Sequence, residues 1–150
     1  AMSALKDRIT EQVKTSMKAR ELEKVKVLRN IQSVIKQIEI DRKIDLDDAG
    51  VLEILQKQLK QRQESLKVFQ DNGREDLAQK EQFEINIIDE FMPQQMSESE
   101  LAELINQEIA AQGASSMQDM GKVMGALKTK TAGRADPAVM SQLVKKALMD

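Results

Sequence analysis

Apolar residues recur every three or four positions along almost the whole chain, and this spacing restricts the fold more than any other feature. One run shows the pattern clearly, and its apolar residues are Leu22, Val25, Leu28, Ile31, Ile35 and Ile38. Spacings of three and four place side chains on one face of an α-helix. Only two prolines, Pro93 and Pro137, interrupt the chain. The sequence therefore predicts an all-α fold.

The helical segments are expected to form two domains. Residues 1–92 are predicted to be a bundle of about four helices, of which the third runs over about residues 48–70. At about 1.5 Å per residue this helix is on the order of 35 Å long and needs long partners. The fourth helix is expected over residues 74–92, because Pro93 prevents it from continuing. Residues 93–96 are predicted to be a linker, and residues 97–150 a small three-helix tail domain.

The composition excludes several kinds of chemistry. The chain has no cysteine and no histidine. Disulfides, thiolate catalysis and cysteine-type zinc sites are therefore excluded, and the usual general base near neutral pH is missing. The acids Asp45, Asp47 and Asp48 are interpreted as helix-start residues rather than metal ligands. We accordingly predict no catalytic residue, no metal site and no cofactor.

The sequence also bears on compartment and assembly. No apolar run approaches the roughly 20 residues of a membrane-spanning helix, and the N-terminus does not show the pattern of a secretory signal. These observations predict a cytoplasmic protein without a membrane partner. They leave its oligomeric state open.

The tail contains a basic segment. Residues 121–148 contain six lysines and arginines against one acid, although the net charge of the chain is −2. The candidate phosphate-contacting residues in this segment are Lys122, Lys128, Lys130 and Arg134. A helix start beside an arginine can hold a phosphate, but Asp136 is expected to cap the donors of the last helix, which begins at Pro137. A phosphate is therefore expected at Lys130 and Arg134, and a solvated basic surface is the alternative.

Three glycines accompany these cations. Gly121 and Gly125 lie four residues apart on the flank of a predicted helix, where each costs roughly 1 kcal/mol relative to alanine. Such a cost suggests the close approach of another backbone, either a neighbouring helix or RNA. Gly133 fits a left-handed turn before the last helix.

Several motifs resemble those of YqeY-like proteins. The most specific are Gly-Lys-Val-Met-Gly at residues 121–125 and Gly-Arg-Ala-Asp-Pro at residues 133–137. Residues 91–97 are similar to the family's linker, and the resemblance covers essentially the whole chain. The tail is also similar to the C-terminal tail of the B subunit of the glutamine-dependent tRNA amidotransferase. In that subunit the tail docks on tRNA, so the resemblance implies a tRNA partner here.

We therefore interpret the chain as a non-catalytic accessory module that binds tRNA or another RNA. One alternative is a helical adaptor for a tRNA enzyme or amidotransferase subunit, with Met117, Met120, Met124 and Met140 as an adaptable surface or simply as tail core. Another is a component of a carbon–nitrogen ligase with glutamine as amide donor, active only in a complex. The resemblance implies that association, whereas the chain offers neither an activated serine with a lysine relay nor a nucleotide cradle.

Overall fold

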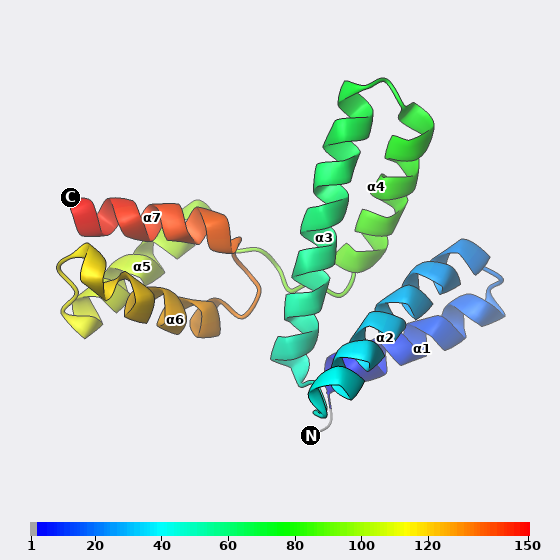
Figure 1. The fold of residues 1–150 in the computed structure, drawn as a ribbon, viewed down its shortest axis with the longest axis horizontal. Coiled ribbons are helices and arrows are strands. Elements are labelled where there is room, and N and C mark those ends of the chain that lie inside the picture. Colours follow the sequence, from blue (N-terminus) through cyan, green and yellow to red (C-terminus); the bar gives the residue numbers. More distant parts are fainter. Residues whose placement is uncertain (1–2) are drawn as a thin grey trace. The chain divides into compact units, whose positions relative to one another are not determined.

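The computed structural model describes residues 3–150, and these residues contain seven α-helices and no strand, which confirms the predicted fold class. The chain divides into two compact units, Ala1–Met92 and Pro93–Asp150, called unit 1 and unit 2 below. Figure 1 shows the helices of both units. Each unit is described separately.

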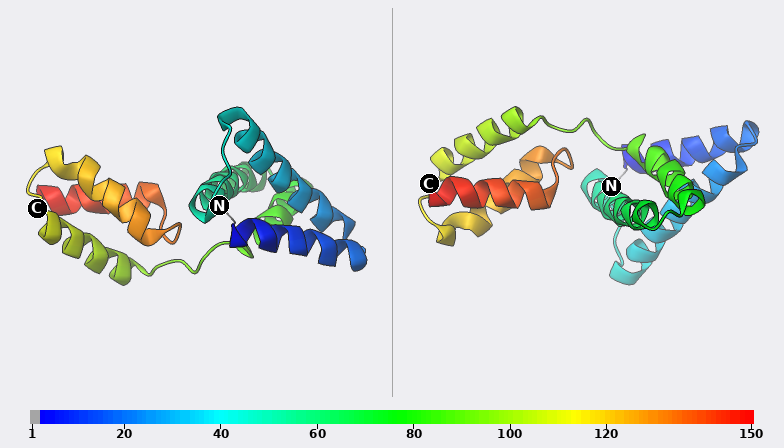
Figure 2. Two further views of the ribbon diagram at one scale, coloured as in Figure 1. Left: turned by 90° about the horizontal axis from the view of Figure 1, so that it is seen from below. Right: turned by 90° about the horizontal axis from the view of Figure 1, so that it is seen from above.

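Unit 1 is built from two helical hairpins. Its helices are α1 (Ala4–Lys18), α2 (Leu22–Arg42), α3 (Asp48–Asp71) and α4 (Glu75–Asp89). Both views in Figure 2 show α1 and α2 meeting at the turn that joins them and spreading apart from there. The 24 residues of α3 give it a length of about 36 Å. Because α3 is so long, α1 and α2 contact only one part of it, and α4 accompanies the rest.

The core of unit 1 lies where α1 and α2 pack on the inner half of the α3–α4 hairpin. Its fully buried side chains include Ile9, Leu28, Ile31, Leu55 and Ile88, each 0% exposed. Burying one such side chain stabilises the fold by about 1.5–3 kcal/mol. The outer half of the hairpin is different, because residues 60–83 add only Ala78 to the buried hydrophobic residues. We call residues 60–83 the arm.

Two carboxylates hold α1 against its neighbours. Asp48 accepts hydrogen bonds from the Ser3 hydroxyl and from the Leu5 N–H, the latter at 3.1 Å. Glu39 accepts hydrogen bonds from Lys6 Nζ at 2.7 Å and from the Leu46 backbone N–H at 2.8 Å. The hydrogen bonds from Ser3 and Lys6 are the main reason why the pKa of each carboxyl lies below its ordinary value. These contacts fix α1 and α2 over the inner half of α3.

One helix boundary differs from the prediction. The helix predicted over residues 74–92 spans Glu75–Asp89. Phe91, which follows it, packs into the core and is only 2% exposed. Pro93 disfavours the α conformation at Met92, the residue before it, and the helix already ends three residues earlier, at Asp89. The burial of Phe91 then completes the core.

Unit 2 is a small three-helix unit with its own core. It consists of α5 (Glu98–Gln112), the 3-10 turn η1 (Met117–Asp119), α6 (Met120–Thr131) and α7 (Pro137–Met149). Its buried hydrophobic residues are Leu101, Ile105, Val123, Leu127, Ala135, Met140 and Val144. Met117, in contrast, is 42% exposed. Met140 belongs to this core, and Met120 and Met124 pack against it.

Candidate functional site

The four cations predicted from the tail do not share one environment. Lys122 and Lys128 are exposed on α6. Lys130 instead forms an ion pair with Glu108 of α5, whose side chain also accepts a hydrogen bond from Gln112 at 2.7 Å. The bond from Lys130, followed by that from Gln112, holds the pKa of Glu108 below its usual value. Lys130 therefore links α6 to α5.

Arg134 is likewise occupied within unit 2. Its Nε donates to the Gln94 carbonyl at 2.9 Å, and its Nη2 lies 3.7 Å from the carboxylate of Glu100. The backbone adds a second link, because the Met96 N–H donates to the Arg134 carbonyl at 2.8 Å. Arg134 thus fastens the segment that precedes α5 to the turn between α6 and α7.

The motif around that turn shapes the chain. Gly133 has a φ of +83°, in the left-handed region that favours glycine. Asp136 accepts a hydrogen bond from the Ala138 N–H at 2.8 Å and caps α7, in which Pro137 is the first residue. The Asp136 carboxylate therefore already accepts from a backbone N–H that a phosphate would need at the start of α7.

The two helical glycines lie on an open surface. A Cβ atom added at Gly121 or Gly125 would have no atom within 4 Å except those of its own helix backbone and of the adjacent residues. The expected close approach of a neighbouring helix is therefore wrong for both positions. Residues 93–150 as a whole contain six lysines and arginines against seven aspartates and glutamates. Unit 2 thus lacks the net positive charge typical of a nucleic-acid-binding domain.

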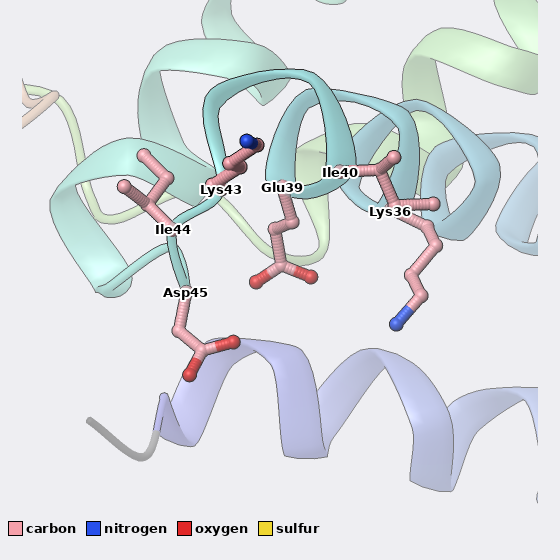
Figure 3. Close-up of a pocket in the computed structure, with 6 residues that line it drawn as sticks. All are labelled: Lys36, Glu39, Ile40, Lys43, Ile44 and Asp45. Atoms are coloured by element: carbon pink, nitrogen blue, oxygen red, sulfur yellow. The ribbon is translucent and has the colours of Figure 1, made fainter.

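A hollow of about 250 Å³ lies in unit 1 where α2 ends. Its lining residues are Lys36, Glu39, Ile40, Lys43, Ile44 and Asp45. Figure 3 shows that the side chains of Lys36 and Glu39 both point toward α1. Glu39 is already bonded to Lys6, so its charge is compensated inside the protein. Two lysines and two carboxylates line this hollow together, and we assign no ligand to it.

A second hollow lies on the arm and is more apolar. It measures about 340 Å³ and is lined by Gln61, Glu64, Ser65, Val68 and Phe69 of α3. The Val68 side chain is 55% exposed although the residue is large and hydrophobic. Exposed apolar side chains around a hollow are typical of binding surfaces.

The position of this hollow follows from the periodicity of α3. Ile54 and Gln58 lie on one row of that helix and are 8% and 7% exposed. The same row continues outward at spacings of three and four residues through Gln61, Ser65 and Val68. The inner part of the row is covered and the outer part is not.

A matching row runs along α4. Ile87 of α4 is 4% exposed and belongs to the core over which α1 and α2 pack, as does Phe91, just after the end of the helix. Phe83 lies one turn further out on the same row and is 44% exposed. Because α3 and α4 are antiparallel neighbours, these two rows lie on the same side of the hairpin. The α3 row is of mixed polarity, since Gln58, Gln61 and Ser65 lie between Ile54 and Val68. We call the outer part of this side, formed by Gln61, Ser65, Val68 and Phe83, the arm face.

Polar contacts lie at the border between the inner half and the arm. Arg62 Nε donates to Glu84 at 2.9 Å and joins α3 to α4. Next to this pair, the Gln58 side-chain oxygen is buried and has no hydrogen-bond partner among the described residues. A buried acceptor without a partner costs stability. The border therefore combines an ion pair between the two helices with a buried acceptor that lacks a partner.

The sequence-based interpretation missed the arm face because it counted one apolar stripe per helix. Leu66 and Phe69 of α3 belong to that stripe. The signal that identifies the arm face is a second row, Ile54 to Val68, offset by one residue from the first. Its outer members include Gln61 and Ser65, so hydrophobicity alone does not reveal it.

Comparison with known proteins decides the family. The family described as "Yqey-like protein" matches residues 6–148. The chain belongs to this family. The predicted YqeY-like resemblance is thereby confirmed. None of the helices in residues 3–150 is long and apolar enough to cross a membrane.

Proteins similar in sequence to this chain carry the name "Altered inheritance of mitochondria protein 41, mitochondrial". The protein from Eremothecium gossypii is 32% identical over 120 residues, which is 79% of this chain and 62% of the relative. That from Pyrenophora tritici-repentis is 27% identical over 146 residues, 95% of this chain and 78% of the relative. That from Saccharomyces cerevisiae is 34% identical over 119 residues, 79% of this chain and 57% of the relative. The chain thus matches only about 60% of the first and third relatives.

These names correct the predicted function. They refer to mitochondria and not to a tRNA-binding module of an amidotransferase, so the prediction of such a module is wrong. Its two alternatives, an adaptor in an amidotransferase or tRNA-processing complex and a ligase component, share that setting and are not kept. In the structure, Lys130 and Arg134 have internal partners, and their side chains are 52% and 41% exposed. Neither the family description nor the relatives' names mention a catalytic activity.

The predicted compartment also needs correction. The relatives are named as mitochondrial proteins, which contradicts the prediction of a cytoplasmic one. Amino-acid composition reflects the aqueous, reducing environment of a protein. The cytoplasm and the mitochondrial matrix both provide such an environment. Composition therefore does not separate the two compartments.

Proposed function

We propose that this member of the YqeY-like family is a docking module that binds a helix of a partner protein and has no catalytic activity of its own. The observation that carries this proposal is the arm face. On the inner half of the α3–α4 hairpin, the rows ending at Gln58 and Ile87 are covered by α1 and α2. On the arm the same rows continue to Val68 and Phe83 without cover.

The expected occupant is an amphipathic α-helix of the partner. The arm face continues a surface on which α1 and α2, with apolar residues at spacings of three and four, already pack. A hollow from Gln61 to Phe69 extends for about 12 Å along α3, which suits about two turns of a crossing helix. Because the relatives' names refer to mitochondria, a mitochondrial partner is the first to test.

Site-specific photo-crosslinking in cells tests this proposal. A photoreactive residue replaces Ser65, in the hollow, or Gln63, on the exposed polar flank of the same helix. We expect one protein adduct from position 65 that is absent at position 63, with the crosslink mapped to an amphipathic helix of the partner. The substitution Val68→Asp, which removes the apolar contact, is expected to abolish that adduct.

Two results would overturn the proposal. One is the same set of adducts from positions 63 and 65, which would show no preference for the arm face. The other is an adduct at position 65 that persists in the Val68→Asp variant or that consists of RNA. Circular dichroism of each variant verifies that the helices remain folded.

A further inference from the structure

The turn between α1 and α2 ends in a basic tip with exposed apolar side chains. Met17 is 49% exposed and Leu22 is 66% exposed, the latter among the highest values for a large hydrophobic residue in unit 1. Lys18 and Arg20 lie between them and are exposed as well. In Figure 1 this turn forms the end of the α1–α2 hairpin, at the right of the view.

Contacts between the two helices show which residues share one side of this hairpin. Arg29 Nη2 of α2 lies 3.3 Å from Met17 Sδ of α1, which places both residues on the same side. Lys14 lies three residues before Met17, on the same face of α1, and Leu22 lies two turns before Arg29 on α2. The basic tip is therefore defined by Lys14, Met17, Lys18, Arg20, Leu22 and Arg29.

The charge of this region is strongly positive. Residues 14–29 contain six lysines and arginines against two acids. Outside the basic tip itself, Lys26 pairs with Glu23 at 3.3 Å and Lys24 pairs with Glu90 at 3.2 Å. Within residues 3–150, Lys14, Lys18 and Arg20 form no ion pair. Three cations at the end of the hairpin are thus available for an external anion.

We propose that the basic tip docks on the surface of an anionic lipid bilayer. Its geometry distinguishes this ligand from a protein helix, because a partner helix requires a groove and the tip is the convex end of a hairpin. At a bilayer surface, apolar side chains such as Met17 and Leu22 enter the headgroup region while cations around them contact lipid phosphates. The prediction of no membrane partner considered spanning segments, and surface docking needs none.

Vesicle flotation with the full chain tests this proposal. Vesicles with about one third phosphatidylserine are expected to carry the protein at low salt, and vesicles of phosphatidylcholine alone are not. The double substitution Lys14→Glu/Lys18→Glu is expected to lower the partition coefficient by about tenfold or more. The control Lys57→Glu/Lys67→Glu changes the net charge equally on exposed positions of α3 and is expected to leave binding within about twofold.

Fluorescence provides a second readout that charge alone would not change. The chain has no tryptophan, so Leu22→Trp introduces a single reporter at the tip, and Val68→Trp introduces one on the arm. Anionic vesicles are expected to shift the emission of the first variant to the blue and to leave the second unchanged. Equal loss of flotation in both double variants, absence of binding to anionic vesicles, or no shift at position 22 would overturn the proposal.

Discussion

The inner and outer halves of the α3–α4 hairpin are built from the same helices but differ in how much of their surface is covered. On the inner half, Ile54 and Ile87 are 8% and 4% exposed, and α1 and α2 cover the rows to which they belong. On the arm, Val68 and Phe83 continue those rows at 55% and 44% exposure. The comparison shows that a helix can extend its packing surface beyond its own core. Such a surface is then free to pack a helix from another protein.

The largest effect is expected when the inner half is emptied. Leu55→Ala leaves a cavity under α1 and α2 and should lower the free energy of unfolding by about 2–5 kcal/mol. Urea denaturation followed by circular dichroism measures this loss. A loss below about 1 kcal/mol would show that the inner half is not the core of unit 1.

The second-largest effect is expected from acid, which should lower the stability of the inner half. The pKa values of Glu39 and Asp48 lie below the ordinary values of 4.5 and 3.8, mainly because of the bonds from Lys6 and Ser3. A lowered folded pKa contributes stability that is present above the ordinary pKa and is lost as the pH falls through the folded pKa. The midpoint temperature of thermal unfolding should therefore decrease as the pH is lowered below about 4.5.

Amide substitution provides the control for this pH dependence. The variant Glu39→Gln/Asp48→Asn should be less stable than the parent at pH 7 and should show a flatter decline toward low pH. An unchanged slope between pH 5 and pH 3 would contradict the role assigned to these two carboxylates.

A gain of about 1 kcal/mol is expected at the border of the arm. Gln58→Met removes the buried oxygen that lacks a partner and keeps a long, flexible side chain at that position. Differential scanning calorimetry should record a higher unfolding temperature. A decrease would show that the Gln58 amide has a partner that stabilises the inner half.

A slightly smaller gain is expected from substitutions on the open surface of α6 in unit 2. Gly121→Ala and Gly125→Ala should each raise the free energy of unfolding by about 0.5–1 kcal/mol, because alanine favours the helix and the new Cβ meets nothing within 4 Å. Chemical denaturation of the two single variants measures the change. Destabilisation would mean that a neighbouring segment packs on these glycines.

Sequence reasoning recovers the helices better than the surfaces. Caps such as Ser97 and Asp136 act locally, so the starts of α5 and α7 follow directly from the residue pattern. The partners of Lys130 and Arg134 do not, because Glu108 and Gln94 are distant in sequence and meet these cations only after unit 2 has folded. The sequence therefore predicted a basic motif without internal contacts, whereas Lys130 and Arg134, two of its four cations, form such contacts.

The arm face was hidden for a related reason. Periodicity shows that the row through Gln58 and Val68 exists on α3, but it does not show where α1 and α2 stop covering it. That limit depends on how two hairpins pack, which is a tertiary property. Exposure of Val68 and burial of Ile54 are therefore visible only in the folded unit.

The substitution Val68→Asn tests the central claim most directly, because valine and asparagine have similar helix propensities and the site is 55% exposed. Its unfolding free energy and its crosslinking yield from position 65 are measured on the same preparation. The account predicts a stability within about 0.5 kcal/mol of the parent and the loss of the partner adduct. A stability loss of about 2 kcal/mol or more, with the adduct retained, would contradict it.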